Sequence, residues 1–391
     1  MRKILTLLSL TLALSFTSNF PIFANNILKV INVNATNDKQ NELLGLDDQL
    51  WGSQQKPGDK KALLKSIDNS LRYIDTPAAI NVYKNYPVSG ITRERVKRSL
   101  IRFRQLLLIS KNPQELQKAV KREFQFYRAV GRDQQGTVLF TGYYQPIHEA
   151  SKVQTAEFRY PLYRLPPDFS QWKKPHPSRL QLEGKDGLQG NKGRLKGLEI
   201  AWLRDRLEAY LVQIEGSAIL KFTDGTTTGI GFAAGTDYPY VSLGRELIKA
   251  KELPEEGLTL PILIKYFQEK PEKLDQFIPL NNRFIFFRTK KDLDASGSIS
   301  VPLIPDRSVA TDKSIMPPGA LALIYAPIPY PNNEGKIEPR LVSRYVLDQD
   351  TGSAIKGPGR VDYFMGTGQL AGDRAAITTG TGQFFYLLLK Q

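Results

Sequence analysis

The sequence predicts a mainly β protein with helices near its N-terminus. Between about residues 60 and 130, apolar residues recur with helical spacing. From Val138 onward the pattern changes to short apolar or alternating runs separated by Gly, Pro and Asp, which is typical of strands joined by turns. The chain has 391 residues, 41% of them hydrophobic, which is enough for two domains. We therefore expect a β body of the barrel or sandwich type that follows a helical segment.

The first 24 residues have the pattern of a cleaved secretory signal. Met1 to Lys3 carries positive charge, and Ile4 to Phe16 is an apolar run too short to cross a bilayer. Residues 25–60 are polar, with Asn, Gln and Gly interspersed, and we expect them to form a flexible leader. No later segment has the roughly 20 uninterrupted apolar residues that a membrane helix needs. We therefore expect an exported protein with no transmembrane segment in its mature form.

Missing and rare residue types exclude several kinds of site. The chain has no cysteine, which excludes a thiolate nucleophile, a zinc-thiolate site and an acylated N-terminal cysteine. Only two histidines occur, His148 and His176, and neither has the setting of a Ser-His-Asp triad or of a histidine-based zinc site. We therefore expect no metal and no cofactor.

The net charge of +15 favours an anionic partner. For an exported protein, an anionic cell-wall polymer or a membrane surface is a better candidate than nucleic acid, and we expect no nucleic-acid binding. Positive charge is densest between Arg93 and Arg104, where Val96, Leu100 and Phe103 recur at helical spacing. We interpret this segment as the solvated face of a packed helix, with a binding patch as the alternative.

Individual elements follow from local signals. Asn112, Pro113 and Glu115 supply an N-cap, a proline at the first helical position and an acidic residue at N3, which predicts a helix start. Two further helices are expected at residues 243–252 and 261–269. The strand-like runs are VLFTGYY (138–144), FRYPLYRL (158–165), LEAYLVQI (207–214), RFIFFR (283–288), LALIYAPIP (321–329), RLVSRYVL (340–347), VDYFM (361–365) and FFYLLLK (384–390).

The tripeptide Asp350-Thr351-Gly352 matches the catalytic motif of aspartic proteases. Those enzymes need two aspartates that share one proton, supplied by two such motifs or by a symmetric dimer. Here the motif occurs once, and Asp350 follows the polar residues Asp348 and Gln349 instead of an apolar strand. An aspartic protease is therefore the less favoured alternative.

A second aspartate, Asp362, lies inside the alternating run VDYFM. Residues two apart on a strand share a face, so we expect its carboxyl group beside the ring of Phe364 and partly desolvated. Burial disfavours the charged form and raises the pKa of a carboxyl group, which suits a general acid. The alternative is a structural aspartate that caps a turn or pairs with Arg360.

Several stretches resemble one known family. VATDKSIMPPG (309–319), DTGSAIKGPGRVDYFMGTGQLAG (350–372) and the closing hydrophobic strand resemble the three-aspartate domain of bacterial lytic murein transglycosylases of the membrane-bound A type. Upstream, FTGYYQP (140–146), FRYPLYRLP (158–166), LVQIEGSAIL (211–220) and AAGTDYPYVSLGREL (233–247) resemble the central region of the same family, in the same order. Colinear matches at several separate motifs are more specific than any single motif.

The resemblance implies a double-psi β-barrel domain that is interrupted by an inserted second β domain, with a glycan groove between them. The implied boundaries are residues 61–145 plus 290–391 for the helices and the catalytic barrel, and residues 146–289 for the insert. The helices before residue 130 are expected to pack on the barrel domain.

The resemblance also implies a reaction, cleavage of the β-1,4 bond between N-acetylmuramic acid and N-acetylglucosamine of peptidoglycan with formation of a 1,6-anhydromuramoyl end. One carboxylate suffices, because the C6 hydroxyl of the substrate is itself the nucleophile. Asp362 matches the family's catalytic aspartate, whereas Asp350 and Asp312 match supporting acidic positions that orient the acid or hold loops. The positions implied to bind substrate are Thr141, Tyr143, Tyr144, Gln213, Gly216 and Ser217. For the two tyrosines, core packing is the alternative.

The sequence departs from the family at several points. Glu215 stands where Gln is common, and Gln369 stands where an acidic residue is common. Because the lipoprotein cysteine is missing, we expect an enzyme of the periplasm or cell envelope, or one peripheral to the outer membrane, that is not a lipoprotein. The expected partners are the glycan strands of peptidoglycan, and the expected state is a monomer. A non-catalytic, expansin-like wall-binding protein on the same barrel is the alternative function.

Overall fold

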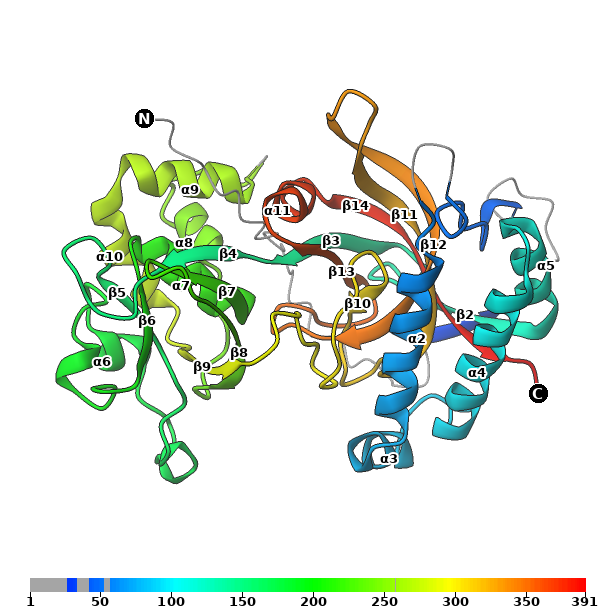
Figure 1. The fold of residues 1–391 in the computed structure, drawn as a ribbon, viewed down its shortest axis with the longest axis horizontal. Coiled ribbons are helices and arrows are strands. Elements are labelled where there is room, and N and C mark those ends of the chain that lie inside the picture. Colours follow the sequence, from blue (N-terminus) through cyan, green and yellow to red (C-terminus); the bar gives the residue numbers. More distant parts are fainter. Residues whose placement is uncertain (1–26, 34–41, 53–56, 257) are drawn as a thin grey trace. The chain divides into compact units, whose positions relative to one another are not determined.

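The computed structural model describes residues 27–33, 42–52, 57–256 and 258–391, and these divide into two compact units (Figure 1). The barrel unit contains the described residues up to Gly142, together with Ser296–Gly366 and Ile377–Gln391. The insert unit contains Tyr143–Ala295 and Thr367–Ala376. The predicted signal at residues 1–24 lies outside the described residues. In the described part of the chain, none of the helices combines the length and apolar character that a membrane span requires.

One sheet dominates the barrel unit, with the strand order β1-β2-β14-β11-β12-β10-β13-β3. Because β14 also pairs with β3, the strands β3 and β10 to β14 close into a barrel. Closure leaves these strands without a free sheet edge along their paired lengths. The bounds are β1 (Leu28–Ile31), β2 (Phe124–Ala129), β3 (Val138–Gln145), β10 (Ser308–Ala310), β11 (Leu321–Pro331), β12 (Ile337–Asp350), β13 (Arg360–Thr367) and β14 (Thr379–Leu389).

Strand β14 shows how the core of the barrel unit is built. Its residues Phe384 to Leu388 are all buried, without the alternation of a half-exposed strand. A continuous apolar run is expected where both faces of a strand are covered. Helix α4 contributes part of this cover, since Ser99 Oγ accepts a hydrogen bond of 2.9 Å from the Leu389 amide. The helices of this unit are α2 (Lys60–Ile74), α3 (Pro77–Lys84), α4 (Arg93–Ile109) and α5 (Pro113–Glu123).

Two helix predictions for this unit are confirmed. The side chain of Asn112 accepts a hydrogen bond of 2.9 Å from the Glu115 amide, and Pro113 opens helix α5. On the basic helix α4, Arg95 is buried and donates to the Leu389 carbonyl oxygen at 2.9 Å, while Arg102 pairs with Glu123 at 2.6 Å. These contacts confirm that α4 is a packed helix, but the expectation that its basic residues form a solvated face is wrong for Arg95, which is buried.

The expectation of a flexible leader over residues 25–60 is wrong for its described parts. Leu28–Ile31 forms strand β1, which pairs antiparallel with β2. Asp47 and Asp59 both pair with the fully buried Arg307, each at 2.5 Å. Because a buried guanidinium is costly unless its charge is paired, these aspartates are part of the folded unit. The polar composition hid this, since it carries no information on distant partners.

The insert unit is built around two small sheets. Four strands pair in the order β4-β7-β8-β9, and β5 pairs with β6. The strands are β4 (Ile147–Ala150), β5 (Tyr160–Tyr163), β6 (Glu199–Leu203), β7 (Ser217–Phe222), β8 (Thr227–Gly235) and β9 (Ile285–Lys290). The helices are α6 (Arg179–Glu183), α7 (Arg206–Glu215), α8 (Leu243–Lys249), α9 (Leu260–Glu269), α10 (Leu274–Phe277) and α11 (Gln369–Ala376), with 3-10 turns at Phe169–Gln171, Gly190–Lys192, Pro271–Lys273 and Ile278–Leu280. Helices α8 and α9 confirm the two predicted there.

One run predicted as a strand, LEAYLVQI, is instead helix α7. The Asp205 side chain caps its start by accepting a hydrogen bond of 2.9 Å from the Glu208 amide. Gly216, with φ of 75°, ends it in the left-handed conformation that glycine adopts without strain. An almost wholly apolar run of eight residues has no clear period, so its capping residues decide between strand and helix.

Candidate active site

Asp362 lies at the centre of a hydrogen-bonded cluster in the barrel unit. Its Oδ1 atom accepts a hydrogen bond from Arg360 Nε at 2.8 Å and another from the Thr141 hydroxyl group. Its Oδ2 atom accepts a hydrogen bond from Arg360 Nη2 at 3.1 Å. The Asp362 side chain is 13% exposed and the Arg360 side chain 3%. Asp362 is therefore a mostly buried carboxyl group that keeps some access to solvent.

The sequence explains how these three side chains meet. Arg360 and Asp362 are two residues apart on β13, so their side chains lie on the same face of the strand. Thr141 lies on β3, which is the neighbour of β13 in the sheet. The predicted strand around Asp362 is confirmed, and Phe364 on it is buried. The pairing with Arg360, which the sequence left open, is present.

The strand register separates Asp350 from Asp362. Ala310 on the short strand β10 is the Cα partner of Asp350 on β12 and of Asp362 on β13. Neighbouring strands lie about 4.8 Å apart, so the two aspartates are about 10 Å apart at their Cα atoms. Their carboxyl groups bind different partners and do not bond to each other. The proton-sharing pair of an aspartic protease is therefore not formed by these two residues.

The two predicted supporting aspartates bind loop backbone. Asp350 Oδ1 accepts a hydrogen bond of 2.8 Å from the Ser298 amide. Asp312 is buried, and its Oδ1 atom accepts from the amide of Ser314 at 3.1 Å and from its hydroxyl group at 2.6 Å. The Oδ2 atom of Asp312 accepts from the Gly357 amide at 2.8 Å. Asp312 thus ties its own loop to the loop that precedes β13.

Sequence reasoning missed the role of Asp348. This residue is fully buried on β12 and accepts hydrogen bonds from Thr311 Oγ1 at 2.8 Å, from the Tyr386 hydroxyl group at 2.7 Å and from Lys313 Nζ. Burial raises the pKa of Asp348, and the nearby Lys313 charge acts in the opposite direction. Lys313 Nζ also donates to the Asp350 carbonyl oxygen. The available signal was the polar pair at positions 348 and 349 in an apolar strand, which we used only as an argument against a protease.

In the insert unit, four of the predicted substrate-binding residues lie at element ends. Tyr143 is half-buried, while Tyr144 is buried, and burial together with the charge of Glu215 raises the pKa of Tyr144. Gly216 and Ser217 join α7 to β7 and are both partly exposed. Tyr143, Gly216 and Ser217 therefore keep solvent access, whereas Tyr144 packs inside the unit.

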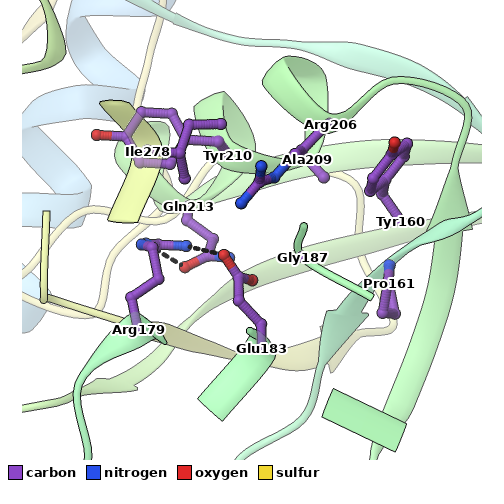
Figure 2. Close-up of a pocket in the computed structure, with 10 residues that line it drawn as sticks. All are labelled: Tyr160, Pro161, Arg179, Glu183, Gly187, Arg206, Ala209, Tyr210, Gln213 and Ile278. Carbon is purple, nitrogen blue, oxygen red and sulfur yellow. Dashed lines mark hydrogen bonds and ion pairs between the residues drawn. The ribbon is translucent and has the colours of Figure 1, made fainter. Parts of the chain in front are cut away.

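Gln213, which the family resemblance implies to bind substrate, is buried in the insert unit. Its Oε1 atom accepts a hydrogen bond of 2.9 Å from Arg179 Nη2 (Figure 2). The same atom accepts a hydrogen bond of 3.1 Å from the Ile285 amide. Arg179 also donates to Glu183 at 3.0 Å. Because the amide oxygen already binds two internal donors, the structure gives Gln213 a place in the packing of the insert unit.

Figure 2 also shows a small cavity beside Gln213, lined by Tyr160, Arg206 and Glu183 among others. Its volume is about 10 Å³, which is room for one water molecule. In the described part of the chain, the Nε and Nη2 atoms of Arg206 have no hydrogen-bond partner, while Nη1 pairs with Asp275. The cavity is too small for a sugar ring, so it is a feature of the insert packing.

The chain matches two family models, the MltA specific insert domain over residues 139–288 and the 3D domain over residues 307–388. It is 30% identical over 259 residues to membrane-bound lytic murein transglycosylase A of Escherichia coli K12, which covers 66% of this chain and 67% of the relative. The crystal structure of the membrane-bound lytic murein transglycosylase of Agrobacterium tumefaciens is 25% identical with a TM-score of 0.66, covering 85% of this chain and 93% of that one. E. coli MltA with bound chitohexaose also has a TM-score of 0.66 at 24% identity, covering 85% of this chain and 90% of that one.

The closed barrel matches the 3D domain and the separate insert matches the MltA specific insert domain, and together with the relatives they define a peptidoglycan lytic transglycosylase. The chain belongs to the membrane-bound lytic murein transglycosylase A family. The family resemblance and the fold class expected from the sequence, a barrel domain with an inserted β domain, are confirmed.

Proposed function

We propose that this protein is a peptidoglycan lytic transglycosylase in which Asp362 is the single acid and base. The observation that carries the proposal is the Asp362 side chain, which is 13% exposed and bound by Arg360 and Thr141, with no carboxyl group of the described residues bonded to it. The names of its relatives support the activity, and the chitohexaose bound to E. coli MltA supports a glycan substrate. The bond to be cleaved is the β-1,4 link between N-acetylmuramic acid and N-acetylglucosamine.

A single carboxyl group suffices for this reaction. Glycoside hydrolases need a second carboxylate, either to activate water or to attack the sugar. Here the C6 hydroxyl group of the muramoyl residue replaces water as the nucleophile. It is already tethered to the reacting ring, so its attack does not carry the entropic cost of a bimolecular step.

Asp362 gives up one proton during the reaction and then regains one. Asp362 donates a proton to the glycosidic oxygen as the bond from that oxygen to C1 of the muramoyl ring breaks. The Asp362 carboxylate then accepts the C6 hydroxyl proton while the C6 oxygen forms a new bond to C1. The products are a chain with a new C4 hydroxyl group and a 1,6-anhydromuramoyl end. Asp362 returns to its protonated form, and no water is consumed.

The other predicted residues receive supporting parts in the proposal. Asp312 and Asp350 are loop anchors, which is supported by their hydrogen bonds to Gly357 and Ser298. We assign substrate contacts to the positions that keep solvent access, together with Thr141 beside Asp362: Tyr143, Gly216 and Ser217. Tyr144 and Gln213 are assigned to packing in the insert unit, because both are buried. The family name supports action in the cell envelope.

Mass spectrometry of digested murein tests the proposal. The native protein is expected to release anhydromuropeptides, and Asp362→Asn to release them at least about 100-fold more slowly, because general acid catalysis contributes that much or more. Asp224→Asn, at an exposed turn, is the control and should keep full activity. Equal activity of native protein and Asp362→Asn would contradict the assignment. Binding to murein without any product from the native protein would favour the expansin-like alternative.

A further inference from the structure

Both oxygens of Asp362 are bound by one guanidinium group, and this clamp has a consequence for the reaction. We propose that Arg360 is a positioning residue that fixes the carboxyl group of Asp362 and leaves Oδ2 as the atom that gives and takes the proton. The inference rests on the proposed function, since it concerns how the assigned acid is held.

The clamp is bidentate. Nε and Nη2 are the two donors on one edge of a guanidinium, and they bind Asp362 Oδ1 at 2.8 Å and Oδ2 at 3.1 Å. Parallel bonds of this kind fix the plane of a carboxyl group as well as its position. Arg360 is itself held, because Nη1 donates to the Ala354 carbonyl oxygen at 3.3 Å and its side chain is 3% exposed.

Counting lone pairs distinguishes the two carboxyl oxygens. Each carboxylate oxygen accepts about two hydrogen bonds. Oδ1 of Asp362 accepts two, from Arg360 Nε and from the Thr141 hydroxyl group. In the described part of the chain, Oδ2 accepts one, from Arg360 Nη2. A proton therefore fits on Oδ2 without breaking a bond, whereas a proton on Oδ1 would displace Thr141 or Arg360.

The clamp acts on the chemical step more than on substrate binding. A hydrogen bond between a guanidinium and a carboxyl group is strongest when the carboxyl group is ionised. Asp362 becomes ionised while it donates its proton, so the interaction with Arg360 strengthens during bond cleavage. An interaction that is stronger in the transition state than in the ground state raises kcat and leaves KM nearly unchanged.

Substitutions of Arg360 test the inference on soluble glycan fragments. Arg360→Lys keeps a buried charge but cannot bind both oxygens. We expect kcat of Arg360→Lys and Arg360→Ala to fall about 10- to 100-fold with KM within about 2-fold, since loss of orientation alone has effects of this size. Added guanidinium ion should restore part of the kcat of Arg360→Ala, and methylammonium should not. Full kcat in Arg360→Lys, or equal rescue by both ions, would overturn the clamp.

Two controls separate this inference from the proposed function and from a fold defect. Arg132→Gln removes a second positive charge close enough to Arg360 to act on it electrostatically, while Asp362 keeps its bonds to Arg360 and Thr141, and this variant should keep the native kcat. If Asp362→Asn is inactive while Arg360→Ala keeps native kcat, the inference fails and the proposed function stands. If Asp362→Asn stays active, the proposed function itself fails. Rescue by guanidinium ion requires a folded site, so it also excludes loss of folding as the cause.

Discussion

Asp348 and Asp350 lie on β12 and Asp362 lies on β13, with β10 between these two strands of the barrel, and the three aspartates differ in their partners. Asp348 is fully buried against Lys313, Asp350 holds the Ser298 amide, and Asp362 keeps 13% exposure beside Arg360. Burial keeps Asp348 from meeting a substrate, whereas Asp350 and Asp362 are both partly exposed and are distinguished by their partners. The chemical role of an aspartate here thus follows from its partners and burial, and not from the motif that contains it.

Removing the cation of the buried Asp348 pair should destabilise the barrel unit. Lys313→Met is expected to lower the free energy of unfolding by about 3 kcal/mol, because it leaves a buried carboxylate without its counter-charge. Lys313→Met with Asp348→Asn should recover much of that loss, since Asn can still accept from Thr311 and Tyr386. Urea unfolding at pH 7 measures both.

The way in which the stability loss of Lys313→Met changes with pH provides a second test of this pair. Burial raises the pKa of Asp348 above 3.8, so the stability contributed by its protonated form is fully present below pH 3.8 and is lost as pH rises through the folded-state pKa. The deficit of Lys313→Met should therefore shrink at acid pH. A deficit that is constant with pH, or no recovery in the double variant, would contradict this account of the pair.

At the scale of elements, capping residues predicted where a helix begins more reliably than apolar spacing predicted whether a segment is a helix or a strand. The N-cap at Asn112 was identified correctly, because Asn, Pro and an acidic residue at fixed offsets have a local mechanism. Helix α7 was mistaken for a strand, although Asp205 and Gly216 mark its two ends. Capping residues can be recognised in a single sequence, whereas the apolar residues of a mostly buried segment show neither the helical period nor the alternation of a strand.

The junction of α4 and α5 should respond to acid. Arg102 on α4 donates two hydrogen bonds to Glu123, the last residue of α5, at 2.6 and 3.1 Å, and these chiefly lower the pKa of Glu123 to about 2. A lowered pKa contributes stability that is present above pH 4.5 and is lost as pH falls toward about 2. Because both side chains are partly exposed, we expect Glu123→Gln to cost about 1 kcal/mol at pH 7.

Thermal unfolding across pH measures this contribution. The difference between the native protein and Glu123→Gln should vanish near pH 2. Glu255→Gln, on an exposed loop, should show no difference at any pH. A loss in Glu123→Gln that is the same at pH 7 and pH 2 would mean that packing, and not the ion pair, is responsible.

Three prolines protect one edge of the β11–β12 hairpin. Pro327, Pro329 and Pro331 alternate along β11, beyond Tyr325, where its pairing with β14 ends. Pro329 lies opposite Pro339 on β12. Because neither proline has an N–H group, the two form a non-hydrogen-bonded pair of the antiparallel ladder. In such a pair the backbone nitrogens point away from the partner strand. At these three positions β11 therefore offers no N–H donor on the side away from β12, which disfavours pairing with another strand there.

Restoring donors on this edge should promote association. The double variant Pro329→Val and Pro331→Val is expected to form larger species as its concentration rises, as judged by size-exclusion chromatography with light scattering. Lysine at the same two positions restores the same N–H groups but adds charge, and should keep the native size. Association in both variants, or in neither, would argue against edge protection by the prolines.

At the scale of the whole chain, the order of the motifs predicted the architecture and missed the role of the N-terminal segment. Matches spread from residue 140 to 388 predicted a barrel interrupted by an insert, because their order fixes which segments belong together. Asp47 and Asp59 pair with Arg307, about 250 residues away along the chain, and single-sequence patterns do not report such pairs. The Arg360–Asp362 pair was foreseeable, because both lie on one strand face.

The most direct test of the central claim is digestion of murein in water enriched in a heavy oxygen isotope. If the C6 hydroxyl group attacks and Asp362 alone moves the proton, the new muramoyl ends contain no solvent oxygen and are lighter by one water than hydrolysis products. Mass spectrometry of the first products should therefore show unlabelled anhydro ends. Heavy oxygen at the anomeric carbon would show that water is the nucleophile and would contradict the account.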